Sequence, residues 1–274
     1  MERRGRESFF KHSRRLTPYI GVDCGDLVFL VSTRDTGLGR RLFVKRDRGE
    51  MRTLATALEV LASEGLQARM ETFVDVGANI GTTTLLALRA GFHHVVACEP
   101  DPDNARLLRM NIAANVALET VTALEVAVSD HVGDSLLDRR ASSWGKRRLV
   151  AVSSEEATVS VPVTSLDALA AAGTIVPDDV GLLWIDVEGH EGHVLAGACS
   201  LLERGVPVVF ELHTRRLDRS GTGTRLTELL MQHYTDLVDL RDGSAAQVQA
   251  IAALPDVIER RRAGGHTDVL VFRR

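Results

Sequence analysis

Five ionisable side chains crowd one short segment of the sequence, residues 184–193. The segment ends an apolar run, and Asp186 and Glu188 alternate onto one side if that run continues as a strand. Glu211 and His213 close the next apolar run in the same way. Neighbouring parallel strands end at one edge of a sheet, so we expect these four side chains to converge. They form the candidate catalytic set, because ionisable groups at such an edge can move a proton or bind a ligand.

A glycine-containing loop over residues 74–81 is the second candidate. Gly77 lets the backbone turn sharply, and Gly81 opens a helix whose free N–H groups can face a ligand. The loop has Asn79 between these glycines and lacks the G-x-G-x-x-G spacing that admits a pyrophosphate. Asp75 would repel phosphates, and it suits a ligand with an ammonium group, such as the methionine part of S-adenosylmethionine (SAM).

Two further strand ends carry polar residues. Glu99, followed by Pro100, stands where a carboxylate can accept hydrogen bonds from both hydroxyls of a ribose. NAD-binding folds use the same device, so Glu99 alone does not identify the ligand. Ser129 and Asp130 follow a third strand, where adenine would lie, although a plain turn explains them nearly as well. The candidate cofactor-binding residues are therefore Asp75, Gly77, Asn79, Gly81, Glu99, Pro100, Ser129 and Asp186.

The elements that position these residues begin at residue 72, where predicted strands start to alternate with helices. Such alternation predicts an α/β fold, a mostly parallel sheet with helices on both faces. The last two strands lack a long helix between them, which indicates an antiparallel pair at the end of the sheet. The predicted strands are Thr72–Val76, Val95–Cys98, Val121–Val128, Leu182–Val187, Val206–Leu212, Leu237–Leu240 and Asp268–Phe272. The predicted helices are Thr82–Arg89, one capped by Asp101, and Glu191–Glu203, with His190 and His193 as helix-entry residues.

The chain divides into an N-terminal extension (residues 1–70) and the α/β domain (71–274). In the extension we expect a loosely packed basic tail, a β-hairpin and a helix. The hairpin strands would be Leu27–Ser32 and Arg41–Lys45, and the helix Met51–Glu64. A polar insertion at residues 130–163 is interpreted as a substrate-side flap. Its arginines are either a solvated face or a site for an anionic substrate, such as a nucleotide-linked or phosphorylated sugar.

Composition limits the classes of function. The chain is 45% hydrophobic and 26% charged, with a net charge of -4, which is typical of a globular protein and not of a general nucleic-acid binder. It has no apolar run long enough for a membrane span and no secretory signal, so a cytoplasmic location is expected. We expect a small-molecule partner, and neither a membrane nor nucleic acid. The sequence leaves the oligomeric state open, a homo-oligomer included.

Five motifs carry a family resemblance: Val74–Gly81, Glu99–Asp101, Ala127–Asp130, Asp167 after Thr164-Ser165-Leu166, and Ile185–Glu191. Together they resemble the FkbM family of SAM-dependent methyltransferases. The resemblance implies a class I methyltransferase fold, a Rossmann-like seven-stranded sheet with one antiparallel strand. It also implies O-methylation of a hydroxyl on a sugar, a polyketide or another secondary metabolite. Family members commonly have a lysine shortly before the Asp-x-Glu-Gly motif, whereas this chain has Leu183-Trp184.

Two mechanisms fit these residues. In the first, His213 or Asp186 removes the proton of the acceptor hydroxyl. In the second, Asp186, Glu188, Glu211 and His213 hold Mg²⁺ or Mn²⁺, which lowers the pKa of that hydroxyl. The rival functions are an RNA methyltransferase, a non-catalytic SAM-binding protein and, least favoured, a nicotinamide-dependent oxidoreductase.

Overall fold

A computed structural model describes all of the chain except residues 1–2, 47–48, 67–68, 151–157 and 242–246. The strands are β1 (Tyr19–Asp23), β2 (Val28–Ser32), β3 (Thr72–Val76), β4 (His94–Cys98), β5 (Val121–Leu124), β6 (Ala127–Val128), β7 (Gly133–Asp138), β8 (Arg148–Val150), β9 (Thr158–Thr164), β10 (Val180–Ile185), β11 (Val208–Leu212), β12 (Asp236–Asp239), β13 (Gln249–Ala250) and β14 (Thr267–Phe272). The α-helices are α1 (Arg3–Ser13), α2 (Leu38–Lys45), α3 (Gly49–Ser63), α4 (Thr82–Arg89), α5 (Pro102–Ala114), α6 (Leu166–Ala171), α7 (Glu191–Ala196), α8 (Cys199–Glu203), α9 (Thr214–Ser220), α10 (Gly223–His233) and α11 (Leu254–Gly264). Short 3₁₀-helices include η1 (Trp144–Lys146).

The main sheet has the strand order β13-β12-β14-β11-β10-β3-β4-β5. Strands β5, β4, β3, β10 and β11 are mutually parallel, while β14 runs antiparallel to both of its neighbours, β11 and β12. The predicted seven-stranded sheet with one reversed strand is therefore confirmed, and the two-residue β13 adds a short antiparallel edge. The final pair is antiparallel as predicted, but the expectation that no long helix separates its strands is wrong, because α11 lies between them.

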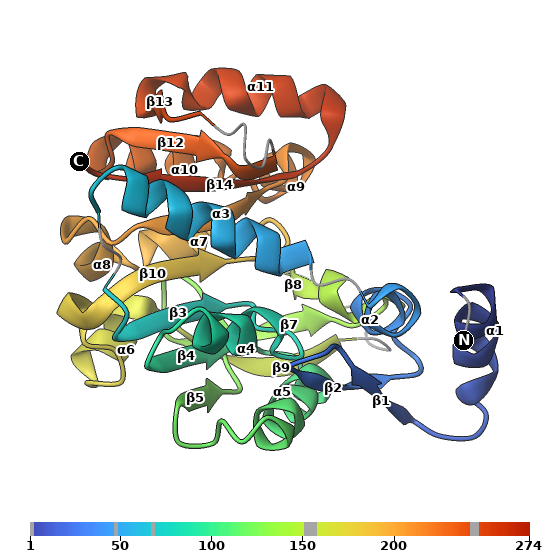
Figure 1. Cartoon of the computed structure of the whole chain (residues 1–274). Coiled ribbons are helices and arrows are strands. Elements are labelled where there is room, and N and C mark those ends of the chain that lie inside the picture. The colour runs from blue at the N-terminus through green and yellow to red at the C-terminus, as the bar shows by residue number, and fades with distance from the viewer. Residues whose placement is uncertain (1–2, 47–48, 67–68, 151–157, 242–246) are drawn as a thin grey trace.

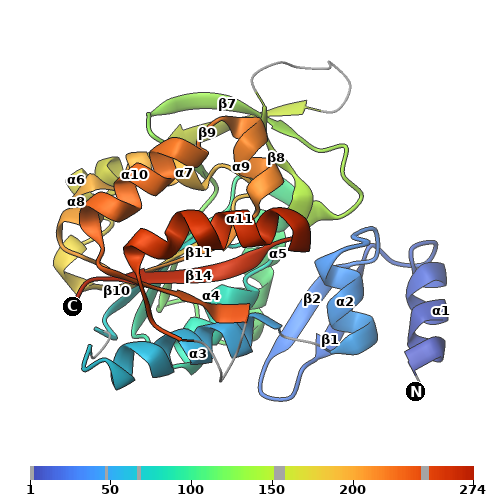
Figure 2. The ribbon, with the colours of Figure 1, turned by 90° about the horizontal axis from the view of Figure 1, so that it is seen from above.

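Helices cover the sheet on both faces, in three layers (Figures 1 and 2). Strand residues alternate between the faces: Phe73 packs with Leu85 of α4 and Leu108 of α5 in one buried cluster. Val74 packs with Val194 of α7 in the other cluster. Successive residues of a strand thus pack into the two cores on opposite faces of the sheet. Each parallel strand is therefore an almost continuous apolar run. In the described part of the chain, no helix has the length and apolarity needed to cross a membrane.

The N-terminal extension differs from its prediction in two places. A β-hairpin is present, but it joins β1 to β2, and the predicted second strand, Arg41–Lys45, belongs to helix α2. The predicted turn before it is a helix start, because the Asp35 carboxylate accepts the N–H groups of Gly37 (2.8 Å) and Gly39 (2.6 Å). The basic tail is not loosely packed: it forms α1, which buries Phe10 beside Phe43 of α2. Helices α1 and α2 with strands β1 and β2, residues 3–46 and called here the N-terminal unit, lie on one side of the molecule in both views, with α1 outermost (Figures 1 and 2).

Two other predicted elements are each broken in two. The third strand, Val121–Val128, splits at residues 125–126: β5 stays in the main sheet, and β6 pairs with β9 of the insertion. The helix predicted over Glu191–Glu203 is interrupted at Gly197, where a Cβ would lie 2.2 Å from the Ser129 carbonyl oxygen. The second piece, α8, begins at Cys199, where the Asp167 carboxylate accepts the N–H groups of Cys199 and Ser200.

The predicted insertion is a small sheet, ordered β6-β9-β7-β8, with residues 151–157 outside the described part of the chain. Its tip is attached to the N-terminal unit through Asp35, which is buried and also accepts the Trp144 N–H (3.1 Å). Thr36 adds two contacts, from its N–H to the Ser142 carbonyl (3.1 Å) and from its hydroxyl to the Ser142 hydroxyl (3.0 Å). Segments more than 100 residues apart in the sequence are therefore joined through one carboxylate and one threonine.

We expect Asp35→Ala to lower the free energy of unfolding by about 3 kcal/mol, because it leaves buried backbone donors without a charged acceptor. Urea denaturation measures the loss. Thr36→Ala is the matched control, because the side chain of Thr36 is exposed and makes one hydroxyl contact. Equal stability of the two variants would show that Asp35 does not hold the insertion to the N-terminal unit.

Candidate functional site

The glycine loop and the acidic segment touch at the carboxyl edge of the sheet. The Asp186 N–H donates to the Val76 carbonyl (3.0 Å), which extends the pairing of β10 with β3 by one residue. Gly77 has φ +89°, and a Cβ on it would lie 2.0 Å from the Asp186 carbonyl oxygen. Only glycine satisfies both the backbone angle and the close approach. The sequence prediction that Gly77 makes a sharp turn agrees with this geometry.

Two cavities open at this edge. The first, called here the inner cavity, encloses about 860 Å³ including its mouth. The second, the outer cleft, encloses about 1920 Å³ including open solvent. Inner-cavity residues come from the glycine loop, the ends of β4, β6 and β10, the starts of α4 and α5, and the insertion. They include Gly77, Asn79, Thr82, Glu99, Pro100, Asn104, Val128, Arg147, Asp186 and His190. Outer-cleft residues come from α1, α2, η1 and the ends of β10, β11 and β14.

Six residues line both spaces: Leu38, Asn79, Gly145, Trp184, Asp186 and Glu188. The inner cavity and the outer cleft therefore share a wall. Asp186 stands in this wall with its side chain exposed to the cavities. A ligand in one space and a ligand in the other would meet at this residue.

The inner cavity contains buried polar atoms without a protein partner. Within the described residues, the Asn79 Oδ1, Asn104 Oδ1 and Arg147 Nε atoms have no hydrogen bond. All three residues line this cavity. Buried polar groups are nearly always hydrogen-bonded, so these atoms indicate a polar ligand with both donors and acceptors. Arg147 is otherwise held by its ion pair with Asp101 (2.6 Å) and by stacking over Trp144.

Glu99 lies at the end of β4, as predicted, and lines the inner cavity. Its carboxylate accepts the N–H groups of Asn79 (2.8 Å) and Asp101 (2.9 Å), which ties it to the glycine loop and to the start of α5. Burial raises the pKa of Glu99 to about 7, despite these hydrogen bonds to the charged form. Its protonation therefore changes near neutral pH.

Three predicted cofactor residues do not line the inner cavity. Asp75 points to the helix-covered face of β3, where it is buried and accepts a hydrogen bond from the Thr84 hydroxyl (2.6 Å). Gly81 (φ +89°) begins α4 and lies against Leu108, so it serves helix packing. Side chains of a strand alternate between the two faces of the sheet, so Asp75, within β3, points to a face of the sheet and not to its ligand edge.

Ser129 is the third of these residues, and it is buried behind His190. Its hydroxyl lies 2.9 Å from His190 Nε2, and the imidazole, not the hydroxyl, lines the inner cavity. Burial and the nearby His193 lower the pKa of His190 to about 4, so the ring is neutral near pH 7. His190 also precedes α7, as predicted, while His193 pairs with Asp130 (2.9 Å).

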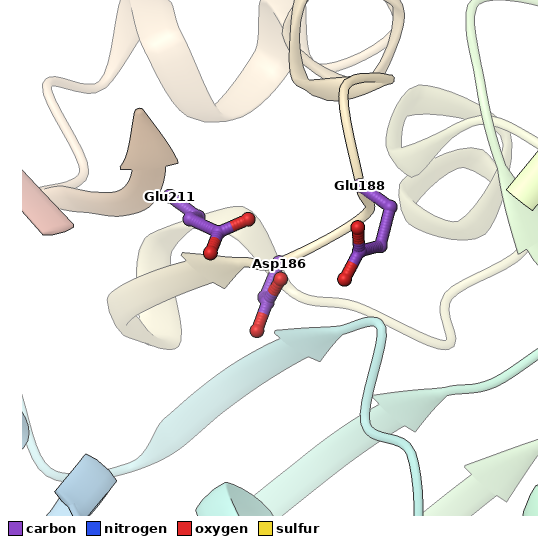
Figure 3. Close-up of side chains that lie close together, drawn as sticks. All are labelled: Asp186, Glu188 and Glu211. Carbon is purple, nitrogen blue, oxygen red and sulfur yellow. The ribbon is translucent and has the colours of Figure 1, made fainter. Parts of the chain in front are cut away.

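Three of the four predicted catalytic side chains converge in the outer cleft (Figure 3). Asp186, Glu188 and Glu211 each bring a carboxylate oxygen within 4.8 Å of the others. Arg216 of α9 pairs with Glu188 (2.5 Å) and Glu211 (2.6 Å), so two of the carboxylates share one guanidinium. Glu188 has φ +58° and is followed by Gly189, whose close packing on Arg216 leaves no room for a Cβ.

His213 is the fourth predicted catalytic residue, and it is not part of this carboxylate group. It lies at the start of α9, lines the outer cleft and stacks on His266 with ring centroids 6.1 Å apart. Burial and the nearby Arg216 lower the pKa of His213. The structure thus brings His213 to the cleft but away from the wall shared with the inner cavity.

The carboxylates repel one another, and protein atoms surround them closely although Asp186 is open to the cavities. Burial, then Glu211 and Glu188, raise the pKa of Asp186 well above its usual range. Burial raises the pKa of Glu188 to about 7, although Arg216 opposes the rise. Glu191, buried in the first turn of α7, also reaches about 7. Such raised values are typical of sites that hold or transfer protons.

Several lining residues escaped the sequence analysis. Trp184 of β10 and Leu38 of α2 were given no role from the sequence, and both line the two cavities. Thr82 and Thr83 line the inner cavity, and their position directly after the glycine loop was the available signal. The insertion was expected on the substrate side, and it borders both cavities through Gly145.

The strand order with its reversed β14, and a cavity at the carboxyl edge beside β3, define a class I methyltransferase fold. The chain belongs to the FkbM methyltransferase family, because residues 75–241 match the family model described as "Methyltransferase FkbM domain". The resemblance seen in the sequence is thereby confirmed.

One relative is the hexuronic acid methyltransferase AglP of Haloferax volcanii, 28% identical over 236 residues, which cover 80% of this chain and 92% of that protein. Two solved structures are more distant. TYW2 of P. horikoshii in complex with MeSAdo has a TM-score of 0.46 at 14% identity, covering 94% of this chain and 72% of that one. A geranyl diphosphate methyltransferase in complex with SAM has a TM-score of 0.44 at 13% identity, covering 85% and 87%.

The raised carboxyl pKa values predict a pH-dependent stability. An acid whose folded pKa lies above its unfolded value stabilises the fold at low pH, and that contribution is lost as pH rises through the folded pKa. For Glu191, a pKa of about 7 in the folded protein against 4.5 in the unfolded chain corresponds to a loss of about 3 kcal/mol in the free energy of unfolding. We expect the free energy of unfolding to fall as the pH rises from about 4.5, the unfolded pKa, to about 7, the folded pKa, as measured by urea denaturation.

Glu191→Gln should reduce this fall and stabilise the protein at pH 8, because its amide cannot ionise. The substitution fits the site: one carboxylate oxygen accepts the Gly189 N–H (3.0 Å), and the other has no partner among the described residues. Glu203→Gln, at an exposed position of α8, is the control and should change nothing. A variant at position 191 that retains the full pH dependence would contradict the assignment.

Proposed function

We propose that the protein is a SAM-dependent O-methyltransferase that methylates a hydroxyl of a small, sugar-type acceptor. One observation carries the proposal: Asp186 stands in the wall shared by the inner cavity and the outer cleft. Methyl transfer needs a donor and an acceptor aligned in contact, with a proton acceptor within hydrogen-bond reach. Two cavities meeting at a carboxylate of raised pKa supply that arrangement.

The inner cavity is the proposed donor site. Its glycine loop at Gly77 and Asn79, and the carboxylate of Glu99, suit a nucleoside with an attached amino acid. The unpartnered atoms of Asn79, Asn104 and Arg147 support a ligand rich in hydroxyl, amine and carboxylate groups. SAM has these groups and, when bound, supplies a methyl on a sulfonium centre. Glu99 would accept the ribose hydroxyls, and the neutral ring of His190 would lie near the base.

The outer cleft is the proposed acceptor site. Transfer of the methyl from sulfur to a hydroxyl oxygen releases the hydroxyl proton, and Asp186 is the proposed acceptor of that proton. An ordinary aspartate is a weak base, and the raised pKa of Asp186 brings it closer to the basicity that proton transfer requires. The relative that methylates a hexuronic acid supports a sugar as the acceptor.

The metal alternative draws on the same carboxylates. Asp186, Glu188 and Glu211 are close enough together to share a cation, and an all-carboxylate set suits Mg²⁺. Two of the three are already neutralised in part by Arg216, whose guanidinium occupies one side of the group. This pairing favours base catalysis by Asp186 with Arg216 as the resident cation, and His213 is the alternative base.

We expect Asp186→Asn to lower the methyl-transfer rate about 10²- to 10⁴-fold, the usual contribution of a general base. SAM affinity should stay within about threefold, because Asn keeps the shape of the wall and one carbonyl oxygen. The measurement is transfer to a hexuronic acid glycoside, with SAM binding measured separately by calorimetry. In the wild type, the rate should rise with pH as Asp186 loses its proton.

Two further measurements can refute this assignment. His213→Gln should reduce the rate less than Asp186→Asn does, and the opposite order would make His213 the base. Activity should survive EDTA, whereas a loss that Mg²⁺ restores would establish the metal mechanism. Asp178→Asn, on the surface and paired with Arg204, is the matched control and should be fully active.

Glu99→Gln should weaken SAM binding about 10- to 100-fold, because hydrogen bonds to a charged group are worth about 1.5–3 kcal/mol. Wild-type affinity for SAM should rise from pH 6 to pH 8, as Glu99 ionises near pH 7 and becomes a better acceptor for the ribose hydroxyls. The variant should lose this dependence. Affinity that is independent of pH in both proteins would remove Glu99 from the donor site.

A further inference from the structure

We propose that one wall of the outer cleft binds an anionic group of the acceptor, a carboxylate or a phosphate. This wall, called here the basic wall, consists of Arg3, Arg40, Arg41, Lys45 and Lys146. The inference rests on the proposed function in one respect, namely that the acceptor enters the outer cleft. It goes further by naming the charge of the acceptor and the residues that recognise it.

The charges of the cleft are separated between its two sides. Among the described lining residues contributed by α1, α2 and η1, five are basic and Glu7 is acidic. The opposite side, formed by the strand ends, carries Asp186, Glu188, Glu211 and Asp268, with Arg216 pairing two of them. A ligand in this cleft therefore meets a positive potential on one side and a negative one on the other.

The basic wall is built from three segments: Arg3 comes from α1, and the other two segments are held in a fixed relation. Helix α2 supplies Arg40, Arg41 and Lys45, and the insertion supplies Lys146. Asp35 joins them, because its carboxylate binds both the start of α2 and the Trp144 N–H. The contact of Thr36 with Ser142 reinforces the same junction. A preorganised cluster of cations costs less to order around an anion than separate flexible side chains would.

Two lysines of the basic wall are available to a ligand. Lys45 and Lys146 are exposed, and neither forms a hydrogen bond or an ion pair within the described residues. The neighbouring arginines of the insertion are engaged elsewhere: Arg139 and Arg147 pair with Asp101, and Arg140 pairs with Asp138. Of the described basic residues in the run 139–148, Lys146 is the one that lines the outer cleft, where its charge also lowers the pKa of Glu188.

The charge separation also orients the acceptor. An anionic group is repelled by the carboxylates around Asp186 and attracted by the basic wall, so it lies away from the point where the two cavities meet. A hydroxyl carries no charge and can approach Asp186 as a hydrogen-bond donor. An acceptor with both groups, such as a hexuronic acid or a sugar phosphate, is thus bound with its hydroxyl towards the methyl donor. A neutral sugar lacks this constraint.

The test uses three methyl glycosides that differ only at carbon 6: the glucoside, the glucuronoside and the glucoside 6-phosphate. Calorimetry at low salt measures the affinity of the intact protein for each, with S-adenosylhomocysteine present. We expect wild type to bind an anionic glycoside at least ~10-fold tighter than the neutral one, and salt to reduce the difference. The preferred anionic glycoside distinguishes a carboxylate from a phosphate as the recognised group.

The double variant Lys45→Gln/Lys146→Gln should lose most of the preference for the anion. The control is Lys11→Gln/Arg14→Gln, which removes two exposed charges of the N-terminal unit outside the cleft and should retain the preference. Equal affinity for charged and neutral glycosides, no binding of either charged glycoside, or an unchanged preference in the Lys45/Lys146 variant would overturn the inference. Failure of the proposed function is separate, since it appears as absent SAM binding or absent methyl transfer.

Discussion

The close contact between the ends of β3 and β10 is the constraint on which the rest of the site depends. The backbone at Gly77 passes so near the Asp186 carbonyl that no side chain fits between them. Because the two strand ends touch, the loop that lines the inner cavity and the carboxylate that faces the outer cleft are direct neighbours. A larger residue at position 77 would separate these strand ends. It would also separate the donor from the acceptor.

The second constraint is the buried carboxylate of Asp35, which closes the site from the opposite side. It binds backbone groups of α2 and of the insertion tip, two segments that would otherwise have no fixed relation. The basic wall is completed because these segments are held together: α2 supplies three of its cations and the insertion adds Lys146. The N-terminal unit is therefore part of the site, although its strands do not join the main sheet.

The sequence predicted what depends on local pattern. Apolar runs of strand length located the parallel strands, and polar residues at their ends led to the convergence of Asp186, Glu188 and Glu211. It failed where long-range contacts decide the structure. Helix α2 was taken for a strand because its start depends on the Asp35 carboxylate, which resembles a turn residue. Asp75 was assigned to the ligand because the sequence does not show which face of β3 its side chain occupies. The contact with Thr84 of α4 decides that face. The part of the outer cleft that α2 supplies had no signal in the sequence, whereas the insertion with η1 was expected on the substrate side.

The acidic group around Asp186 reduces stability, and the same repulsion is useful for catalysis. Arg216 pairs with Glu188 and Glu211, which leaves the three neighbouring carboxylates incompletely compensated, and burial and mutual repulsion raise the pKa values of Asp186 and Glu188. A fold selected only for stability would replace one of them by a neutral residue. Keeping all three would make Asp186 a stronger base than an isolated aspartate, as the proposed removal of a proton from the acceptor hydroxyl requires. The basic wall offsets this effect in part, because Lys146 lowers the pKa of Glu188. An anionic acceptor would pair with the cations of the basic wall and not with the carboxylates, so the proposed binding and the proposed proton transfer would use opposite sides of the same cleft.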